Sequence, residues 1–180
     1  MNEKTRKMLI LGPIAAIIMI LLIVIIILII STLGKPSKKA AEKIVNTYIA
    51  AMNDDDGEKA MEVTDAEGYI IFKEYGEKKF DKNYKKKKEY LKDYYDRNDL
   101  EDKEDAENAL AKEFKNTYQY NSYEYSLKDK VTVEKSSKSK KLVVIKAKIK
   151  QKSTYSSDTS TYKFYVMKVG GKYKIVGVVK

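Results

Sequence analysis

The chain has 180 residues and a formal net charge of +10, and it contains neither Cys nor His. These absences exclude disulfides, lipid-modified cysteine anchors, thiolate metal sites, imidazole general bases and most zinc and copper sites. The length allows one globular domain plus an additional segment. We predict no cofactor, no metal site and no catalytic residue.

An uncharged apolar run over 8–30 is long enough to cross a bilayer as a helix, which needs about 20 residues. A cleaved signal peptide would have a shorter apolar core followed by a small-x-small site, and the following STLGKPSKK offers no convincing site of that kind. We therefore favour an uncleaved signal anchor over a cleaved signal. Its span includes Met8, Ile14, Leu21 and Ile30.

The positive charges that flank this run nearly balance, so the positive-inside rule alone does not orient it. A tiny basic tail before the first apolar segment is the usual layout of a signal anchor with a cytoplasmic amino terminus. We predict a single-pass protein of the cell membrane with an extracytoplasmic carboxy-terminal domain. The predicted parts are a cytoplasmic tail (1–7), a transmembrane anchor (8–33), a linker (34–37) and an α+β domain (38–180), with a helical half (38–120) and antiparallel strands (121–180).

The domain should open with an amphipathic helix. Ser37 is a plausible N-cap, and apolar residues then recur at three- and four-residue spacing. These residues are Ala41, Ile44, Val45, Tyr48, Ile49 and Met52. The helix should stop at NDDDG (53–57), and a shorter helix should follow over 58–63.

The three aspartates of NDDDG raise the alternative of a helix-loop-helix calcium site. With Gly57 at the sixth position of such a loop, the first and twelfth positions are Met52 and Val63. Both positions normally hold carboxylate ligands. We therefore interpret NDDDG as a turn in which Asp55 or Asp56 caps the second helix.

The middle of the chain is harder to interpret. Residues 69–72 fit either a short buried strand or part of a connection between helices. Two helical stripes follow, and Asp99 or Asp102 could cap the second. The first uses Phe80, Tyr84, Leu91, Tyr94 and Tyr95, and the second uses Ala106, Ala109, Leu110, Phe114 and Tyr118. The lysines and tyrosines over 84–97 could contact a polyanion, but interspersed acids favour a solvated helix with charge pairs.

From residue 121 the pattern alternates, as in strands. SYEYSL and KVTVEK form one strand region or two broken at 128–130, and KLVVIKAKIKQK alternates apolar residues with lysines. In TYKFYVMKV, Tyr162, Phe164 and Val166 share a face, and Gly170-Gly171 is a strong hairpin signal before the last strand. This pattern predicts an antiparallel meander with one face buried and one lysine-rich, and helices packed on one face of the sheet.

Charge divides along the same boundary. Residues 121–180 hold 15 Lys against 4 acidic residues, a net charge of +11, whereas 35–120 has a net charge of −3. Such a field could concentrate lipid head groups, wall polymers or nucleic acid. The alternative is that the lysines only keep an exposed sheet face soluble.

The helix with its NDDDG turn and the terminal FYVMKVGGKYKIVGV together resemble the nuclear-transport-factor-2-like (cystatin-like α+β) superfamily. The likeness is to small bacterial membrane-anchored members of unknown function, related to lumazine-binding-like and SnoaL-like proteins. It implies a cone-shaped fold with a long first helix, a short second helix and a curved antiparallel sheet. Enzymes of this fold use a cavity between sheet and helices, which Tyr48, Tyr123, Tyr125 and Tyr162 could line here.

These observations favour a non-catalytic extracytoplasmic module that binds a partner protein or another envelope component. Two alternatives stay open: a small-molecule-binding or catalytic cavity domain, and a domain that binds polyanions through the lysine-rich sheet. The predicted partners are membrane lipid, through the single helix, and an envelope protein or a polyanion, but no specific nucleic-acid sequence. A homodimer also stays open, although exposed lysines would oppose pairing of two sheet faces.

Overall fold

The computed structural model of the chain describes residues 34–120 and 122–180. The predicted membrane anchor over 8–33 lies outside these residues. Among the described helices, none has both the length and the apolar character needed to cross a bilayer. Residues 36–180 belong to one unit, an α+β domain.

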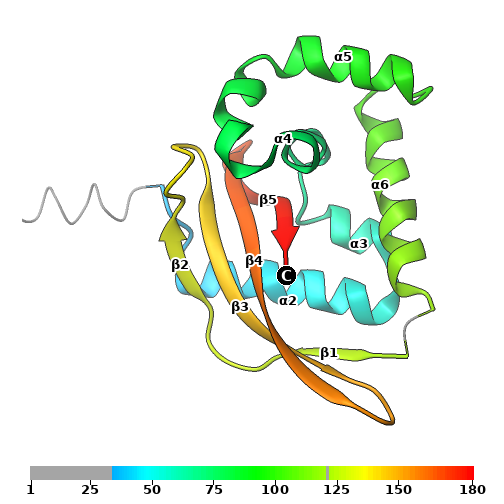
Figure 1. The fold of residues 1–180 in the computed structure, drawn as a ribbon, viewed down its shortest axis with the longest axis vertical. Coiled ribbons are helices and arrows are strands. Elements are labelled where there is room, and N and C mark those ends of the chain that lie inside the picture. Colours follow the sequence, from blue (N-terminus) through cyan, green and yellow to red (C-terminus); the bar gives the residue numbers. More distant parts are fainter. Residues whose placement is uncertain (1–33, 121) are drawn as a thin grey trace, which may run out of the picture. The chain divides into compact units, whose positions relative to one another are not determined.

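Five helices precede five strands in the described part of the chain (Figure 1). The helices are α2 (Lys38–Asp54), α3 (Gly57–Met61), α4 (Ala66–Lys85), α5 (Lys87–Arg97) and α6 (Lys103–Tyr118). The strands are β1 (Glu124–Leu127), β2 (Thr132–Lys135), β3 (Val143–Lys152), β4 (Ser157–Val169) and β5 (Lys172–Val179).

Local signals set both ends of α2 and the start of α3 as predicted, whereas α3 ends at Met61, two residues before the predicted end. The Ser37 side chain accepts a hydrogen bond from the Ala40 N–H and starts α2. Asp55 ends α2 in the left-handed conformation, with φ of 52°, and the carboxylate of Asp56 caps α3 by accepting from the Lys59 N–H. The NDDDG segment therefore forms the predicted turn between two helices.

The strands form one strongly curved antiparallel sheet (Figure 1). β3 pairs with β4 on one side and with both β1 and β2 on the other. Leu127 pairs with Ile149 and Thr132 pairs with Lys146, so five steps along one strand oppose three along the other. This interruption confirms a break between two strands, close to the predicted position.

The last hairpin also follows its sequence signal. Gly170 and Gly171 join β4 to β5 with φ values of 56° and 84°, which is the pair of positive angles that a tight two-residue hairpin needs. β5 then carries one irregularity, because Tyr165 pairs with Gly177 while Val166 pairs with Ile175. The extra residue between them, Val176, is fully buried.

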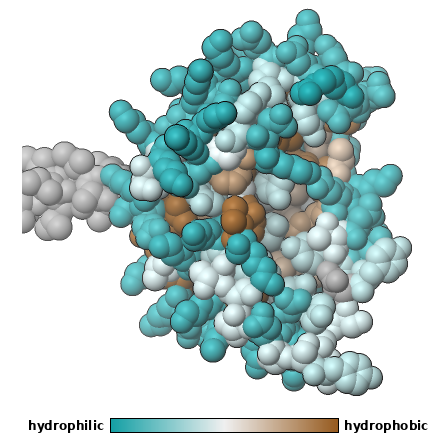
Figure 2. Space-filling model, viewed as in Figure 1, coloured by the Kyte–Doolittle hydropathy of each residue, from teal (hydrophilic) through white to brown (hydrophobic). Residues whose placement is uncertain are grey.

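The sheet is buried on both faces at one end, and this corrects the predicted arrangement. The inner face packs on α2, and its buried residues include Val143, Ile145, Phe164 and Val166. The outer face at the same end packs on α4 and buries Val144, Tyr165, Met167 and Val176 against Ile71, Phe72 and Phe80. Helices therefore cover both faces, and the lysine-rich outer face begins only beyond Val144. Figure 2 shows mostly hydrophilic side chains over the visible face of the domain.

Residues 69–72 belong to α4, so the alternative of a short strand is wrong. Ile70 faces a third apolar cluster between α4, α5 and α6, while the next residues, Ile71 and Phe72, face the sheet. A helix that is buried on two sides shows no simple amphipathic period, which explains the ambiguity of this segment. Asp102 caps α6 as predicted, but Ala109 is exposed and not part of its buried stripe.

The loop between β2 and β3 is held against α4 by two carboxylates. Glu77 accepts a hydrogen bond from the Ser136 hydroxyl group at 2.6 Å. Asp81 accepts from the Ser139 hydroxyl group at 2.5 Å and from the Lys140 N–H at 2.7 Å. These bonds fix the backbone of a loop that would otherwise have few partners.

We expect Asp81→Asn to lower the free energy of unfolding by about 1–2 kcal/mol at pH 7, since it removes a charged acceptor of two hydrogen bonds. Partial burial alone would raise the pKa of Asp81, but the hydrogen bonds from Ser139 and the loop backbone outweigh it, and the pKa is lowered. The contribution should therefore be complete above pH of about 4 and decline as the pH falls below it. Denaturation of both proteins between pH 2.5 and 7 measures it, and Asp93→Asn on exposed α5 should have no comparable effect.

Candidate functional site

A small cavity lies between α2, α3, α4 and α6. Its volume is about 90 Å³, and it is lined by Tyr48, Met61, Thr64, Tyr69, Leu110, Glu113, Phe114, Thr117 and Tyr118. Pockets that hold a substrate or a drug-sized ligand usually measure about 300–1,000 Å³. The cavity therefore has room for a few water molecules or one very small polar ligand.

Aromatic rings fill the space next to this cavity. The Tyr48 ring meets Phe114 edge to face, with ring centroids 5.3 Å apart, and meets Phe164 of β4 in the same way at 5.4 Å. Phe114 also packs on Tyr118, at 4.7 Å. The centre between α2 and the sheet is thus a packed aromatic core, with the cavity at its edge.

Of the four tyrosines that the resemblance suggested, one lines the cavity. Tyr48 does so from α2. Tyr125 is buried beside α2, where its backbone exchanges hydrogen bonds of 2.7 and 2.9 Å with the Asn53 side chain. Tyr162 is half-buried beside Phe164, and Tyr123 is 37% exposed. A ligand-binding role for these four residues stays a prediction.

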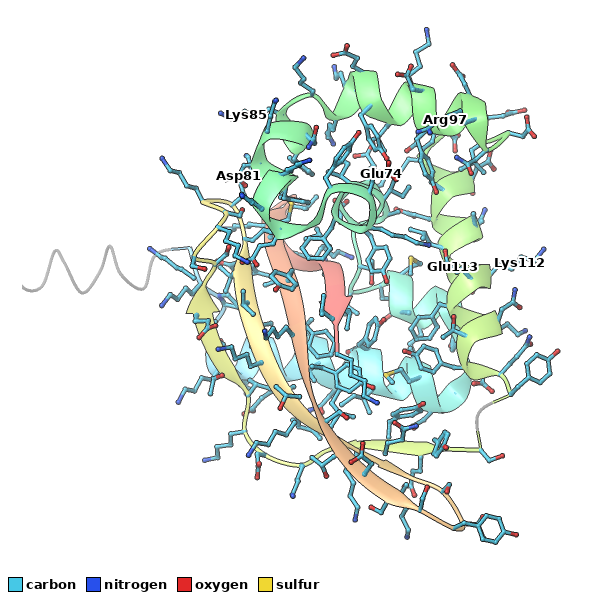
Figure 3. The ribbon with its side chains drawn as sticks, viewed as in Figure 1. Glu74, Asp81, Lys85, Arg97, Lys112 and Glu113 are labelled. Carbon is cyan, nitrogen blue, oxygen red and sulfur yellow. The ribbon has the colours of Figure 1, made fainter. Side chains whose placement is uncertain are left out.

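Sequence reasoning missed the cavity's other polar residues. Tyr69 belongs to the segment 69–72, whose secondary structure is ambiguous from sequence. The sequence places Tyr118 only at the end of an apolar helical stripe. Glu113 lies on α6 and pairs with Lys73 of α4, with Nζ and Oε1 2.6 Å apart. Figure 3 shows Glu113 on α6, near α4. The two helices meet only in the folded chain, so no short motif could reveal the pairing.

The cavity tyrosines are neutral hydroxyl groups under ordinary conditions. Burial is the main cause that raises the pKa of Tyr48 well above its usual value, and burial likewise raises the pKa of Tyr118 and of Tyr69. Tyr48 and Tyr118 also share a side-chain hydrogen bond. A tyrosine with a raised pKa can donate or accept a hydrogen bond but is a poor proton acceptor at neutral pH.

We expect the stability of the domain to fall as the pH rises above 10. The unfolded state ionises tyrosine near pH 10, while the folded state keeps Tyr48 and Tyr118 protonated, so their contribution is complete below pH 10 and is lost above it. Between pH 9 and 11 a Tyr118→Phe variant should lose about 1.4 kcal/mol less of its free energy of unfolding than the wild type. Tyr155→Phe, at a site that is 97% exposed, should behave like the wild type in the same denaturation series.

Lysines occupy the part of the outer sheet face that α4 leaves open. Lys146 pairs with Glu134 at 2.7 Å, and Lys148 pairs with Asp129 at 3.4 Å. Lys163 lies directly across the strands from Lys146. Glu134 and Asp129 are two of the four acidic residues already counted in the net charge of +11, and the structure places both beside lysines of this face.

The fold and this geometry define an α+β domain with a curved antiparallel sheet and a filled centre. Searches with the sequence found no matching family model and no matching curated protein.

Proposed function

We propose that the chain is a single-pass membrane protein whose α+β domain acts outside the cytoplasm as a non-catalytic binding module. The uncharged run over 8–30 supports the membrane anchor, because it is long enough to span the hydrocarbon core. The packed aromatic centre around Phe164 supports a binding function at the surface of the domain. It leaves a cavity of only about 90 Å³, so the larger surfaces available for binding are on the outside.

We further propose that the domain is a member of the nuclear-transport-factor-2-like superfamily. The long α2, the acidic turn, the short α3 and the curved sheet that ends in a Gly170-Gly171 hairpin support this assignment. The segment from α4 to α5 departs from the expected pattern, since α4 covers one end of the outer face of the sheet and α5 packs on α4. That covering supports a surface role different from that of the cavity enzymes with this fold.

The placement outside the cytoplasm can be tested on the full chain in intact cells. A membrane-impermeant amine reagent should label exposed domain lysines such as Lys112 and Lys163 equally well before and after lysis, as measured by mass spectrometry of peptides. A cytoplasmic protein of the same cells serves as the control and should be labelled only after lysis. Domain labelling that needs lysis would place the domain in the cytoplasm.

The binding role can be tested with a photo-reactive side chain at Lys150, on the open part of the outer sheet face. We expect a discrete cross-linked product in intact cells, because a binding module holds its partner against one surface. The same group at Lys112 on α6, on another side of the domain, is the matched control. Equal products from both positions, or none from either, would contradict a specific partner at the sheet.

A further inference from the structure

A basic groove lies between the end of α4 and the β2–β3 loop. Its volume is about 650 Å³, and its lining consists of Asp81, Lys85, Lys135, Ser136, Ser137, Lys138, Ser139 and Lys140. Figure 3 shows Asp81 and Lys85 on the part of α4 that lies next to this loop. Four of the eight lining residues are lysines, whose ammonium groups commonly contact phosphate. Three more are serines, of which Ser136 and Ser139 donate their hydroxyl groups to Glu77 and Asp81.

Among the described residues that line the basic groove, the one acidic residue, Asp81, forms no ion pair with the groove lysines, and the lining keeps a net charge of +3 from four lysines and one aspartate. The carboxylate of Asp81 is engaged by the Ser139 hydroxyl group and the Lys140 N–H. Across the described residues, no ion pair joins any of the four groove lysines to an acid. The loop backbone is held in place while four ammonium groups stay available, which is a fixed scaffold for binding anions.

The basic groove lies at the end of the domain where the chain enters it. Asn53, near the end of α2, is hydrogen-bonded to Tyr125 of β1. From this anchor, β1 and β2 run back along α2 toward its start, and Figure 1 shows the β2–β3 loop on the same side as the first residues of α2. Lys38 and Lys39 are exposed there and add to the positive charge.

The covalent chain keeps this end close to the predicted anchor. Only residues 31–35 separate the apolar run over 8–30 from Pro36, and five residues span at most about 18 Å. A bilayer that holds the run would therefore be tethered by this short linker to Pro36, at the start of the domain. An anionic lipid surface attracts each nearby lysine substantially, and the attraction fades within a Debye length of about 8–10 Å.

We propose that the basic groove docks the domain onto anionic phospholipid head groups of the membrane that holds its own anchor. The inference rests on the membrane tether of the proposed function. Lipid phosphates would bind Lys138, Lys140 and Lys85 through charge-assisted hydrogen bonds. The domain would then sit on the bilayer in one orientation, with α6 and the outer sheet face left free for a partner.

A single fluorescent label can test the docking, because the chain has no cysteine of its own. The full chain carrying Ser137→Cys, at an exposed loop position, is labelled and reconstituted into vesicles that contain a quencher on a lipid head group. We expect strong quenching in phosphatidylglycerol vesicles, weak quenching in phosphatidylcholine vesicles, and reversal by 0.5 M salt. A label at Asn116→Cys on α6 should stay unquenched in both.

Matched variants separate the groove from net charge. Lys138→Gln with Lys140→Gln should lower the ratio of docked to undocked domain by about 30-fold. Lys112→Gln with Lys115→Gln on α6 makes the same change in charge and should have no comparable effect. The reversal of quenching by salt is measured on the labelled chain without any lysine substitution. It therefore tests the inference even if the groove variants fold poorly.

Three results would overturn the inference. The first is equal quenching in both kinds of vesicle. The second is an equal effect of the two lysine pairs. The third is removal of the chain from vesicles by a urea wash, which would also disprove the tether. A chain that resists the wash but does not dock would overturn this inference alone.

Discussion

A Phe164→Ala substitution will lower the free energy of unfolding by about 3–5 kcal/mol. Phe164 is fully buried, pairs with Ile145 across the sheet and meets the Tyr48 ring edge to face. Its removal takes away apolar burial and opens a void in the aromatic core. A domain of this size is usually stable by only about 5–15 kcal/mol, so the loss is a large share of the total free energy of unfolding.

Denaturant titration of the full chain in detergent micelles, followed by circular dichroism, measures this loss. Tyr155→Ala is the matched control, because it removes an aromatic ring that is 97% exposed, and it should change stability by less than about 0.5 kcal/mol. A loss of under 1 kcal/mol for Phe164→Ala would mean that the centre of the domain is loosely filled. That result would favour the alternative function, a domain that binds a small molecule in its cavity.

Gly57→Ala should also destabilise the domain, by about 2–3 kcal/mol. Gly57 opens α3, and a Cβ atom there would lie 2.0 Å from the backbone oxygen of Ala111 in α6. Two helix backbones would have to separate, because no flexible side chain can move aside. In an open helix the same change would stabilise by up to about 1 kcal/mol, so the sign of the effect tests the contact.

The same titration applies to Gly57→Ala, and Asn116→Ala on the exposed side of α6 supplies a control helix substitution with little effect expected. A Gly57→Ala protein as stable as the wild type would show that α3 and α6 are farther apart than described. The expected damage should also reach the small cavity, since α3 and α6 both line it.

The elements that the sequence predicted well are those whose pattern depends on neighbouring residues. Ser37, the six apolar residues of α2 and the alternating residues of β3 each carry a local signal that the structure confirms. The Gly170-Gly171 turn and the Asp102 cap are equally local. In all these places a few neighbouring residues determine the backbone conformation, so it can be predicted without knowledge of distant contacts.

The features that the sequence could not reveal depend on contacts between distant segments. Val144 lies on the same face of β3 as its lysines, and only the packing of α4 shows that it is buried. Ile70 and Ile71 face different clusters, which hid the helix they belong to. The cavity joins Tyr48, Tyr69 and Tyr118 from three helices, and the spacing of these residues carries no common pattern.

The two edge strands of the sheet decide how readily the protein can aggregate by strand addition when many copies are close together. The free side of β5 carries a parallel bridge between Thr64 and Ile175, with flanking hydrogen bonds of 2.7 and 2.8 Å. On the other side, the interruption between β1 and β2 breaks the regular row of backbone groups. An intact, exposed strand edge is a template on which another molecule can add a strand and start aggregation. Because both edges are obstructed, the addition of a strand from a neighbouring copy should be disfavoured even at high local concentration.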